Sequence, residues 1–256
     1  MILLTLFLQK DEVMASTSTL PNRTQARVLY PHAQWYFLLA MGIMWLGFSR
    51  SYFAVVRTEP LLHHIHGALM GGWIVLLAIQ PVLYQRGKIQ LHRTLGRWGV
   101  YLLMPSIVVC GFLMDRRMIR MHNAPPSVID QIAFLDLASM ILFPTLVVLS
   151  IRYARNLQLH ARYIVCTVLL LMPPALTRAL FFVPSMHSFQ ANVNWAEAMV
   201  IFVLLILIAG DKRGGKIWVP YPLALSIFTV LAVASNFVKD WAWWQVLAGW
   251  IAGGST

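Results

Sequence analysis

Residues 130–151 read DQIAFLDLASMILFPTLVVLSI, and this run of 22 residues carries only two charged side chains, Asp130 and Asp136. A helix needs about 20 predominantly apolar residues to cross the hydrocarbon core of a bilayer. Six further apolar runs reach a comparable length: 35–55, 61–84, 95–114, 163–183, 193–209 and 217–238. We therefore predict an all-α, polytopic membrane bundle of about seven transmembrane helices.

The composition of the whole chain agrees with this prediction. Of its 256 residues, 59% are hydrophobic and 11% are charged, and the mean hydropathy is +0.68. Soluble domains average roughly 45–50% apolar and about 25% charged residues. This excludes an ordinary soluble enzyme, a disordered chain, a disulfide scaffold and a nucleic-acid-binding protein. Cys110 and Cys166 both fall within apolar runs, which indicates small buried hydrophobic residues.

The basic residues, which give a net charge of +11, lie mainly in short connections between the apolar runs. There they set the orientation of the helices and contact anionic lipid, so membrane lipid is the expected partner. Lys and Arg are more frequent in the N-terminal segment and in the second, fourth and sixth connections than in the others. The positive-inside rule then places the N-terminus in the cytoplasm and the C-terminus outside, and we expect a bacterial inner membrane.

The predicted transmembrane domain, 31–239, is flanked by two segments of different character. Residues 1–30 form a polar N-terminal tail, and residues 240–256 form a segment rich in tryptophan. Tryptophan is enriched where a membrane meets water, so a short helix over 241–251 is expected to lie in that interface.

Two short motifs recur 68 residues apart in the middle of the chain. Gln90–Arg93 (QLHR) returns as Gln158–Ala161 (QLHA), and Leu102–Pro105 (LLMP) returns as Leu170–Pro173. We interpret predicted helices 2–3 and 4–5 as a tandem hairpin repeat related by an axis along the membrane normal. This arrangement places His92 and His160 opposite each other at the inner ends of the third and fifth helices.

Two histidines facing each other across such an axis are what bis-imidazole haem ligation needs. We therefore predict His92 and His160 as ligands of haem b. Arginines near them are candidates to pair with the haem propionates: Arg93, Arg97 and Arg162. The alternative is a pair of interfacial histidines at helix starts, with arginines that reach anionic headgroups.

The outer ends of the predicted helices hold a second group of polar residues. His63, His64 and His66 begin the second helix, while Asp136 and Glu197 lie inside the fourth and sixth. Imidazole and carboxylate ligands suit zinc or non-haem iron, so these five residues are predicted metal ligands. Arg178, inside the fifth helix, is expected to support this pocket, because charged groups in membrane helices turn inward. The alternative is a structural salt bridge of Asp136 or Glu197 with Arg178.

Several spaced motifs form a recognisable order over residues 60–180. They are His66-Gly67, Trp73, Gln80, the stretch Leu91–Gly96, His160-Ala161-Arg162 and the stretch Pro174–Arg178. This order resembles a group of uncharacterised bacterial multi-helix membrane proteins, although Ala161 stands where that group has a basic residue. Such proteins are broadly similar to membrane cytochromes b and ferric-reductase-like bundles, which place haem between histidines of neighbouring helices. The resemblance implies a redox membrane protein that works with a redox partner or with other membrane subunits.

Three functions follow from these patterns. The first is a metal- or haem-binding membrane protein that transfers electrons through bis-histidine ligation. The second is a metal-dependent hydrolase with its site at the outer leaflet, where a metal-bound water is the nucleophile. The third is a non-catalytic subunit of a larger membrane complex or a small-molecule transporter, which the hairpin repeat permits. Specific catalytic residues are not indicated by any motif.

Overall fold

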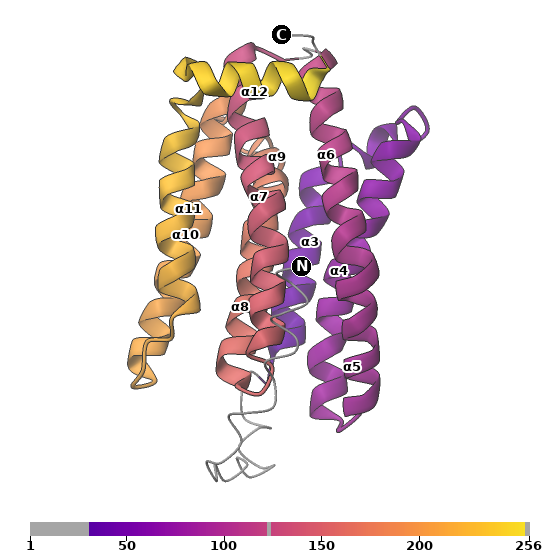
Figure 1. Cartoon of the computed structure of the whole chain (residues 1–256), viewed down its shortest axis with the longest axis vertical. Coiled ribbons are helices and arrows are strands. Elements are labelled where there is room, and N and C mark those ends of the chain that lie inside the picture. The colour runs from indigo at the N-terminus through magenta and orange to yellow at the C-terminus, as the bar shows by residue number, and fades with distance from the viewer. Residues whose placement is uncertain (1–30, 122–123, 254–256) are drawn as a thin grey trace. The chain divides into compact units, whose positions relative to one another are not determined.

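The computed structural model describes residues 31–121 and 124–253, and all of its helices lie in one compact unit that begins at Ala33. The predicted polar tail, 1–30, lies outside the described residues. Within them the chain is entirely α-helical and contains no strand, as the apolar runs predict. Figure 1 shows most of the helices running side by side along one direction.

The helices follow the chain as α3 (Ala33–Phe48), α4 (Leu61–Gln85), α5 (Ile89–Trp98), α6 (Met104–Met121), α7 (Pro126–Arg152), α8 (Leu157–Leu171), α9 (Pro173–Leu180), α10 (Phe189–Arg213), α11 (Pro220–Ser235) and α12 (Ala242–Ala252). A π-helical turn, η2 (Gly99–Leu103), joins α5 to α6 without interruption, and short 3₁₀ turns occur at η1 (Phe53–Val55) and η3 (Val238–Asp240).

Four helical segments are long and apolar enough to cross a membrane: Leu61–Gln85, Ile89–Met121, Pro126–Arg152 and Phe189–Arg213. The pair α8–α9, bent by 42° at Pro173, makes a fifth if it is counted as one broken span. The remaining two predicted spans correspond to α3 and α11, which are apolar but have 16 residues each. At 1.5 Å per residue these two helices are about 24 Å long. The structure is therefore consistent with an integral membrane protein.

The helices extend beyond the apolar runs that predict them. The run 95–114 corresponds to continuous helix from Ile89 to Met121, and the run 193–209 corresponds to Phe189–Arg213. Hydropathy finds only the apolar part of a helix, whereas backbone hydrogen bonding continues through charged residues at its ends.

One predicted boundary is wrong. The run 35–55 is helical only to Phe48, and its last residues form turns that include η1. The peptide N–H of Tyr52 donates to Phe48 O over 2.9 Å, and that of Ala54 donates to Ser49 O over 2.9 Å. Apolar residues in a tight turn have the same hydropathy as apolar residues in a helix, so the sequence pattern does not separate them.

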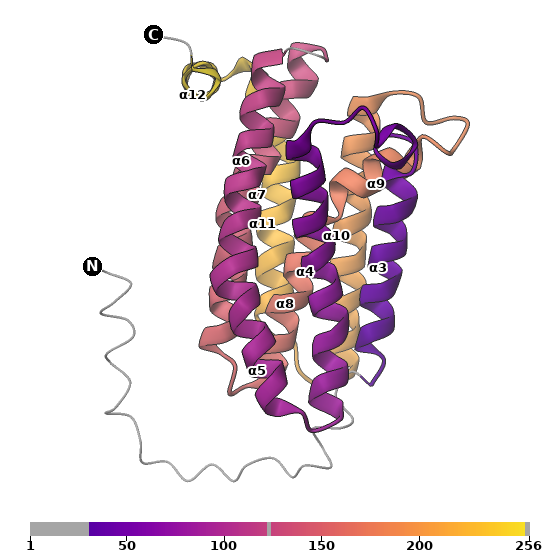
Figure 2. The same cartoon turned by 90° about the vertical axis from the view of Figure 1, so that its right-hand side faces the viewer.

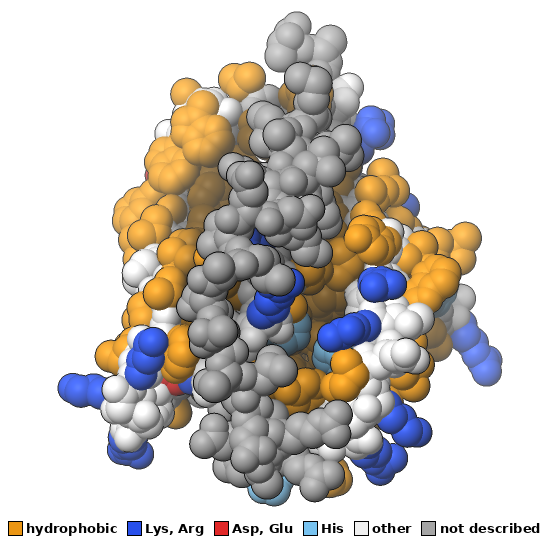
Figure 3. Space-filling view, turned by 60° about the horizontal axis from the view of Figure 1, so that its bottom comes forward, with side chains coloured by type: hydrophobic (Ala, Val, Ile, Leu, Met, Phe, Trp, Pro, Cys, Tyr) orange, Lys and Arg blue, Asp and Glu red, His pale blue; other side chains and the backbone are white. Residues whose placement is uncertain are grey.

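The helices pack around a main apolar core in which Trp73 of α4 meets Phe143 of α7 edge-to-face, with ring centroids 4.9 Å apart, and a second apolar cluster surrounds Trp244. Figures 1 and 2 show the α4–α5, α7–α8 and α10–α11 connections at one end of the bundle. We call this the basic end, because its connections and the adjoining helix ends carry Arg86, Lys88, Arg152, Arg155, Lys212, Arg213 and Lys216. Figure 3, turned so that this end comes forward, shows Lys and Arg side chains grouped on both sides of it.

The opposite end, called the tryptophan end, carries α12, which crosses the ends of the long helices at the top of Figure 1. The indole Nε1 of Trp244 donates to Asp130 Oδ1 over 2.9 Å, and the Gln245 amide donates to Asp130 Oδ2 over 3.2 Å. Gly253, at φ +84°, ends the helix in the left-handed conformation that glycine adopts without strain. The short helix predicted here is present, and its place in a membrane interface stays a prediction.

Because Trp244 is 1% exposed and Trp243 is 56% exposed, the two side chains give a matched pair of variants. Trp244→Ala removes the side chain that fills the contact of α12 with α6 and α7 and should lower stability by about 3 kcal/mol. Trp243→Ala should change it much less. Thermal unfolding in one detergent compares the two, and equal losses would show that α12 is not held by Trp244.

Candidate functional site

The histidines of the repeated motif come together at the basic end. His92 lies in the first turn of α5 and His160 in the first turn of α8, and their ring centroids are 6.3 Å apart with an interplanar angle of 64°. Helix α8 begins there because the Asn156 side chain accepts hydrogen bonds from the N–H groups of Gln158 and Leu159, a standard N-cap. The predicted pairing of His92 with His160 is therefore present in the structure.

Each ring is oriented by a backbone carbonyl of the preceding helix. His92 Nδ1 lies 3.3 Å from Gln80 O, and His160 Nδ1 lies 3.0 Å from Ser150 O and 3.0 Å from Ser150 Oγ. A carbonyl oxygen can only accept, so Nδ1 carries the proton in both neutral rings and Nε2 keeps its lone pair. An Nδ1–H bonded to a carbonyl is the arrangement that orients a metal-ligating histidine.

Other polar groups around the pair are incompletely satisfied. The amide of the Gln80 side chain has a buried oxygen and a buried nitrogen without hydrogen-bond partners in the described part of the chain. Gly96 faces this amide, since a Cβ there would lie 3.8 Å from Gln80 Nε2. Buried polar groups without partners are rare in folded proteins and call for a bound water or ligand. Tyr84 also lies beside His92, with the two ring centroids 6.0 Å apart.

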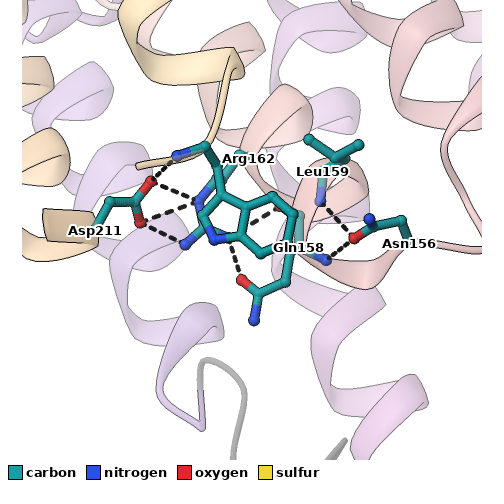
Figure 4. A network of polar contacts seen from close by, with 6 residues as sticks. Asn156, Gln158, Leu159, Arg162 and Asp211 are labelled. Carbon is teal, nitrogen blue, oxygen red and sulfur yellow. Dashed lines mark hydrogen bonds and ion pairs between the residues drawn. The ribbon is translucent and has the colours of Figure 1, made fainter. Parts of the chain in front are cut away.

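The three predicted propionate partners have different surroundings. Arg93 and Arg97 are exposed on α5. Arg162 is instead 5% exposed and forms a buried ion pair with Asp211 of α10, as Figure 4 shows. Its Nε lies 3.1 and 3.0 Å from the two Asp211 oxygens, and its Nη1 donates to Gln158 O over 3.0 Å.

The Arg162–Asp211 pair also fixes the start of α11. Trp218 donates its peptide N–H to Asp211 Oδ2 over 3.2 Å, and the Arg162 guanidinium lies 5.4 Å from the centroid of the Trp218 ring. Sequence reasoning missed this pair, because Asp211 stands among basic residues at a helix end and resembles a solvated charge. Arg162 is thus committed to a structural contact that joins α8, α10 and α11.

The predicted outer histidines each have a different environment. His63 Nδ1 lies 2.7 Å from Glu59 Oε2, and His64 Nδ1 lies 2.7 Å from the Tyr52 hydroxyl. His66 Nδ1 is buried without a hydrogen-bond partner among residues 31–121 and 124–253. Over the same residues, no group of three or more His, Cys, Asp or Glu side chains is arranged to hold a metal ion. The five predicted metal ligands therefore do not form one group in the structure.

Asp136, Glu197 and Arg178, which are predicted to turn inward together, lie close enough to interact electrostatically. Asp136 of α7 interacts electrostatically with Arg178 of α9 and with Glu197 of α10. Asp115 of α6 is a further member, because its carboxyl interacts with the carboxyl of Asp136. The sequence pattern missed Asp115, since the apolar run 95–114 ends one residue before it. We call Asp115, Asp136, Arg178 and Glu197 the charged cluster.

Comparisons of the chain with protein-family models, with curated proteins and with solved structures found no match.

The buried ion pair gives a test of this part of the structure. Asp211→Asn leaves the Arg162 guanidinium buried without its counter-charge and should lower stability by about 3 kcal/mol. The double variant Arg162→Met with Asp211→Leu removes both charges and should recover much of that loss. Asp240→Asn, at an exposed carboxylate, is the control. Thermal unfolding measures all three, and a double variant no more stable than Asp211→Asn would contradict the prediction.

Proposed function

We propose that this protein is an integral membrane haem protein that transfers electrons, with His92 and His160 as the two axial ligands. The observation that carries this proposal is the pairing of the two rings at 6.3 Å, each oriented through Nδ1 by a carbonyl of the neighbouring helix. Neither histidine needs its Nε2 for these contacts, so both have a nitrogen to offer a metal.

The separation of the rings supports a metal held by both histidines. Two metal–nitrogen bonds of about 2.0 Å, with roughly 1 Å from each nitrogen to its ring centre, would separate the ring centroids by at most about 6 Å. The observed 6.3 Å is close to this length, so one iron would be within reach of both rings.

When bound, haem would supply one-electron redox chemistry, and the protein would supply its ligands and its surroundings. His92 and His160 would hold the iron, and the Gln80 and Ser150 carbonyls would keep Nε2 of each ring unprotonated for ligation. Arg93 and Arg97, exposed beside His92, are the cations left to pair with propionates once Arg162 is assigned to Asp211.

We also propose how many times the chain crosses the membrane and in which orientation. We take α3, α4, α5–α6, α7, α8–α9, α10 and α11 as seven spans, with the α4–α5 and α7–α8 hairpins as the start of a tandem repeat. The matching contacts support the repeat, since in each hairpin the first-turn histidine bonds a carbonyl near the end of the preceding helix. The basic end is proposed to face the bacterial cytoplasm, because its connections are rich in Lys and Arg.

A second candidate function, transport of a small molecule or ion, is favoured by a different observation. The α8–α9 pair is bent by 42° at Pro173, and discontinuous helices are typical of binding sites in secondary transporters. The two candidates differ in one property, since only the haem protein absorbs visible light.

The first experiment is the optical spectrum of the detergent-purified protein, supplied with haemin and recorded before and after dithionite. We expect a reducible spectrum of a six-coordinate b-type haem. It should be lost in His92→Ala and in His160→Ala, because each removes one axial ligand. His64→Ala, whose ring bonds Tyr52, is the matched control and should keep the spectrum. A colourless wild-type protein, or a spectrum that survives both ligand variants, would refute the proposal.

The second test concerns the residue that orients His160. Ser150→Ala removes the hydroxyl but keeps the backbone carbonyl, so His160 loses one of its two Nδ1 contacts. Loss of such an orienting group weakens metal binding by about 10-fold or more. We expect haemin titration to show weaker binding in Ser150→Ala and unchanged binding in Ser139→Ala, whose hydroxyl donates to Leu135 O within the same helix. Equal affinities would show that the hydroxyl does not orient the ring.

A further inference from the structure

The charged cluster lies toward the tryptophan end and takes no part in the proposed haem site. Its four side chains come from four helices, Asp115 from α6, Asp136 from α7, Arg178 from α9 and Glu197 from α10. Asp115 is 4% exposed and Glu197 is 8% exposed. Charged groups inside a membrane bundle are costly and mark functional sites such as proton relays.

We propose that Asp115 and Asp136 form a proton-binding site, with Arg178 as its counter-charge and Glu197 as a second carboxyl at an adjoining cavity. Two ionised carboxylates have only acceptor atoms, so the contact between Asp115 and Asp136 requires a proton on one of them. The cluster also contains three carboxyl groups and a single guanidinium. Without a bound proton it would carry two uncompensated negative charges in an apolar interior.

Two further observations support a bound proton. Oδ2 of Asp115 is buried and no donor reaches it among the described residues, so a proton shared with Asp136 would satisfy it. A cavity of about 20 Å³ lies beside Glu197 and is also lined by Ser139 and Pro173. Such a volume holds about one water molecule, the group that carries protons between carboxyls in a protein interior.

The break between α8 and α9 adds polar atoms to this cavity. Pro173 and Pro174 lack peptide N–H groups, so the carbonyls of Leu169 and Leu170 lose their usual helical donors. Both leucines line the cavity. Leu169 O receives a long hydrogen bond of 3.4 Å from Met172 N. These carbonyls give a water beside Glu197 the acceptors that it needs to be bound there.

The other ionisable groups of the packed elements at this end come from α4, α6, α7 and η3. Helix α4 brings His63, His64 and His66. Helix α6 brings Arg117 and Arg120, which are exposed, and Arg116, whose guanidinium lies beside Gly253. Asp130 of α7 accepts from Trp244 and Gln245. The turn η3 adds Lys239 and Asp240, both exposed, while α3, α11 and α12 contribute no Asp, Glu, Lys or Arg. Arg178 is the cation that faces Asp136, where its Nη1 also donates to Pro174 O over 2.8 Å.

Infrared spectroscopy of protein labelled with carbon-13 at the aspartate side-chain carboxyls tests this proposal. At neutral pH the wild-type protein should show the carbonyl stretch of a protonated aspartic acid, and this band should shift in heavy water. Asp115→Asn should abolish it, because the asparagine amide can donate to Asp136 in place of the shared proton. Asp240→Asn, at an exposed carboxylate, should leave the band unchanged.

The folded state of each variant is checked by thermal unfolding. Asp115→Asn should retain the wild-type melting temperature, whereas Asp136→Asn should melt lower because it leaves the half-buried Arg178 without the carboxylate that faces it. If Asp115→Asn does not fold, the wild-type spectrum alone decides. The absence of a protonated aspartic acid in the wild-type protein at neutral pH, or its persistence in folded Asp115→Asn, would overturn the proposal. Neither result depends on whether haem is bound.

Discussion

Buried polar groups in this bundle depend on partners inside the protein, because the helices meet through apolar side chains and an apolar surrounding offers no water. This constraint explains why His92 and His160 each bond a backbone carbonyl. It explains equally why Arg162 and Asp211, on different helices, are joined. The few polar side chains inside the core thus decide which helices are neighbours, while the apolar residues supply most of the contact.

The same constraint implies that buried polar atoms without a hydrogen-bond partner in the protein need a bound ligand or water. The Gln80 amide lies beside the histidine pair, and Asp115 Oδ2 lies in the charged cluster, and neither has a partner in the part of the chain that the structure describes. An apolar interior makes such atoms costly unless something else satisfies them. Unpaired buried atoms occur elsewhere among the described residues too, for example Trp73 Nε1 and Gln131 Oε1. At the histidine pair and the charged cluster they coincide with ionisable side chains from separate helices, which is the reason for proposing a ligand at each.

The all-α architecture and the histidine pair could be predicted from the sequence because both depend on regular spacing. Apolar runs near membrane length indicate helices, and the motif repeated after 68 residues indicates that His92 and His160 occupy equivalent positions. The ion pair of Arg162 with Asp211 and the contact of Asp115 with Asp136 depend instead on how distant helices turn toward each other. A single sequence carries no signal for such contacts, and Asp115 was further hidden by its place at the end of an apolar run. The five predicted metal ligands stay a prediction, since they share a depth in the bundle but do not form one group among the described residues.

The proposed repeat also accounts for the difference between its two halves. Leu102–Pro105 and Leu170–Pro173 have the same sequence, yet the first continues as helix through the π-helical turn Gly99–Leu103, while the second breaks. The residue that follows decides this, because Ser106 keeps its peptide N–H whereas Pro174 removes a second successive donor. The unbroken helix carries Asp115, and the bent one carries Arg178. In the first half of the repeat, the position equivalent to Arg178 is 68 residues earlier and holds Cys110. The Sγ atom of Cys110 lies 3.9 Å from Leu62 O. The two halves therefore share the histidines at the basic end but diverge toward the tryptophan end, where one supplies the carboxyl and the other the guanidinium that flank Asp136.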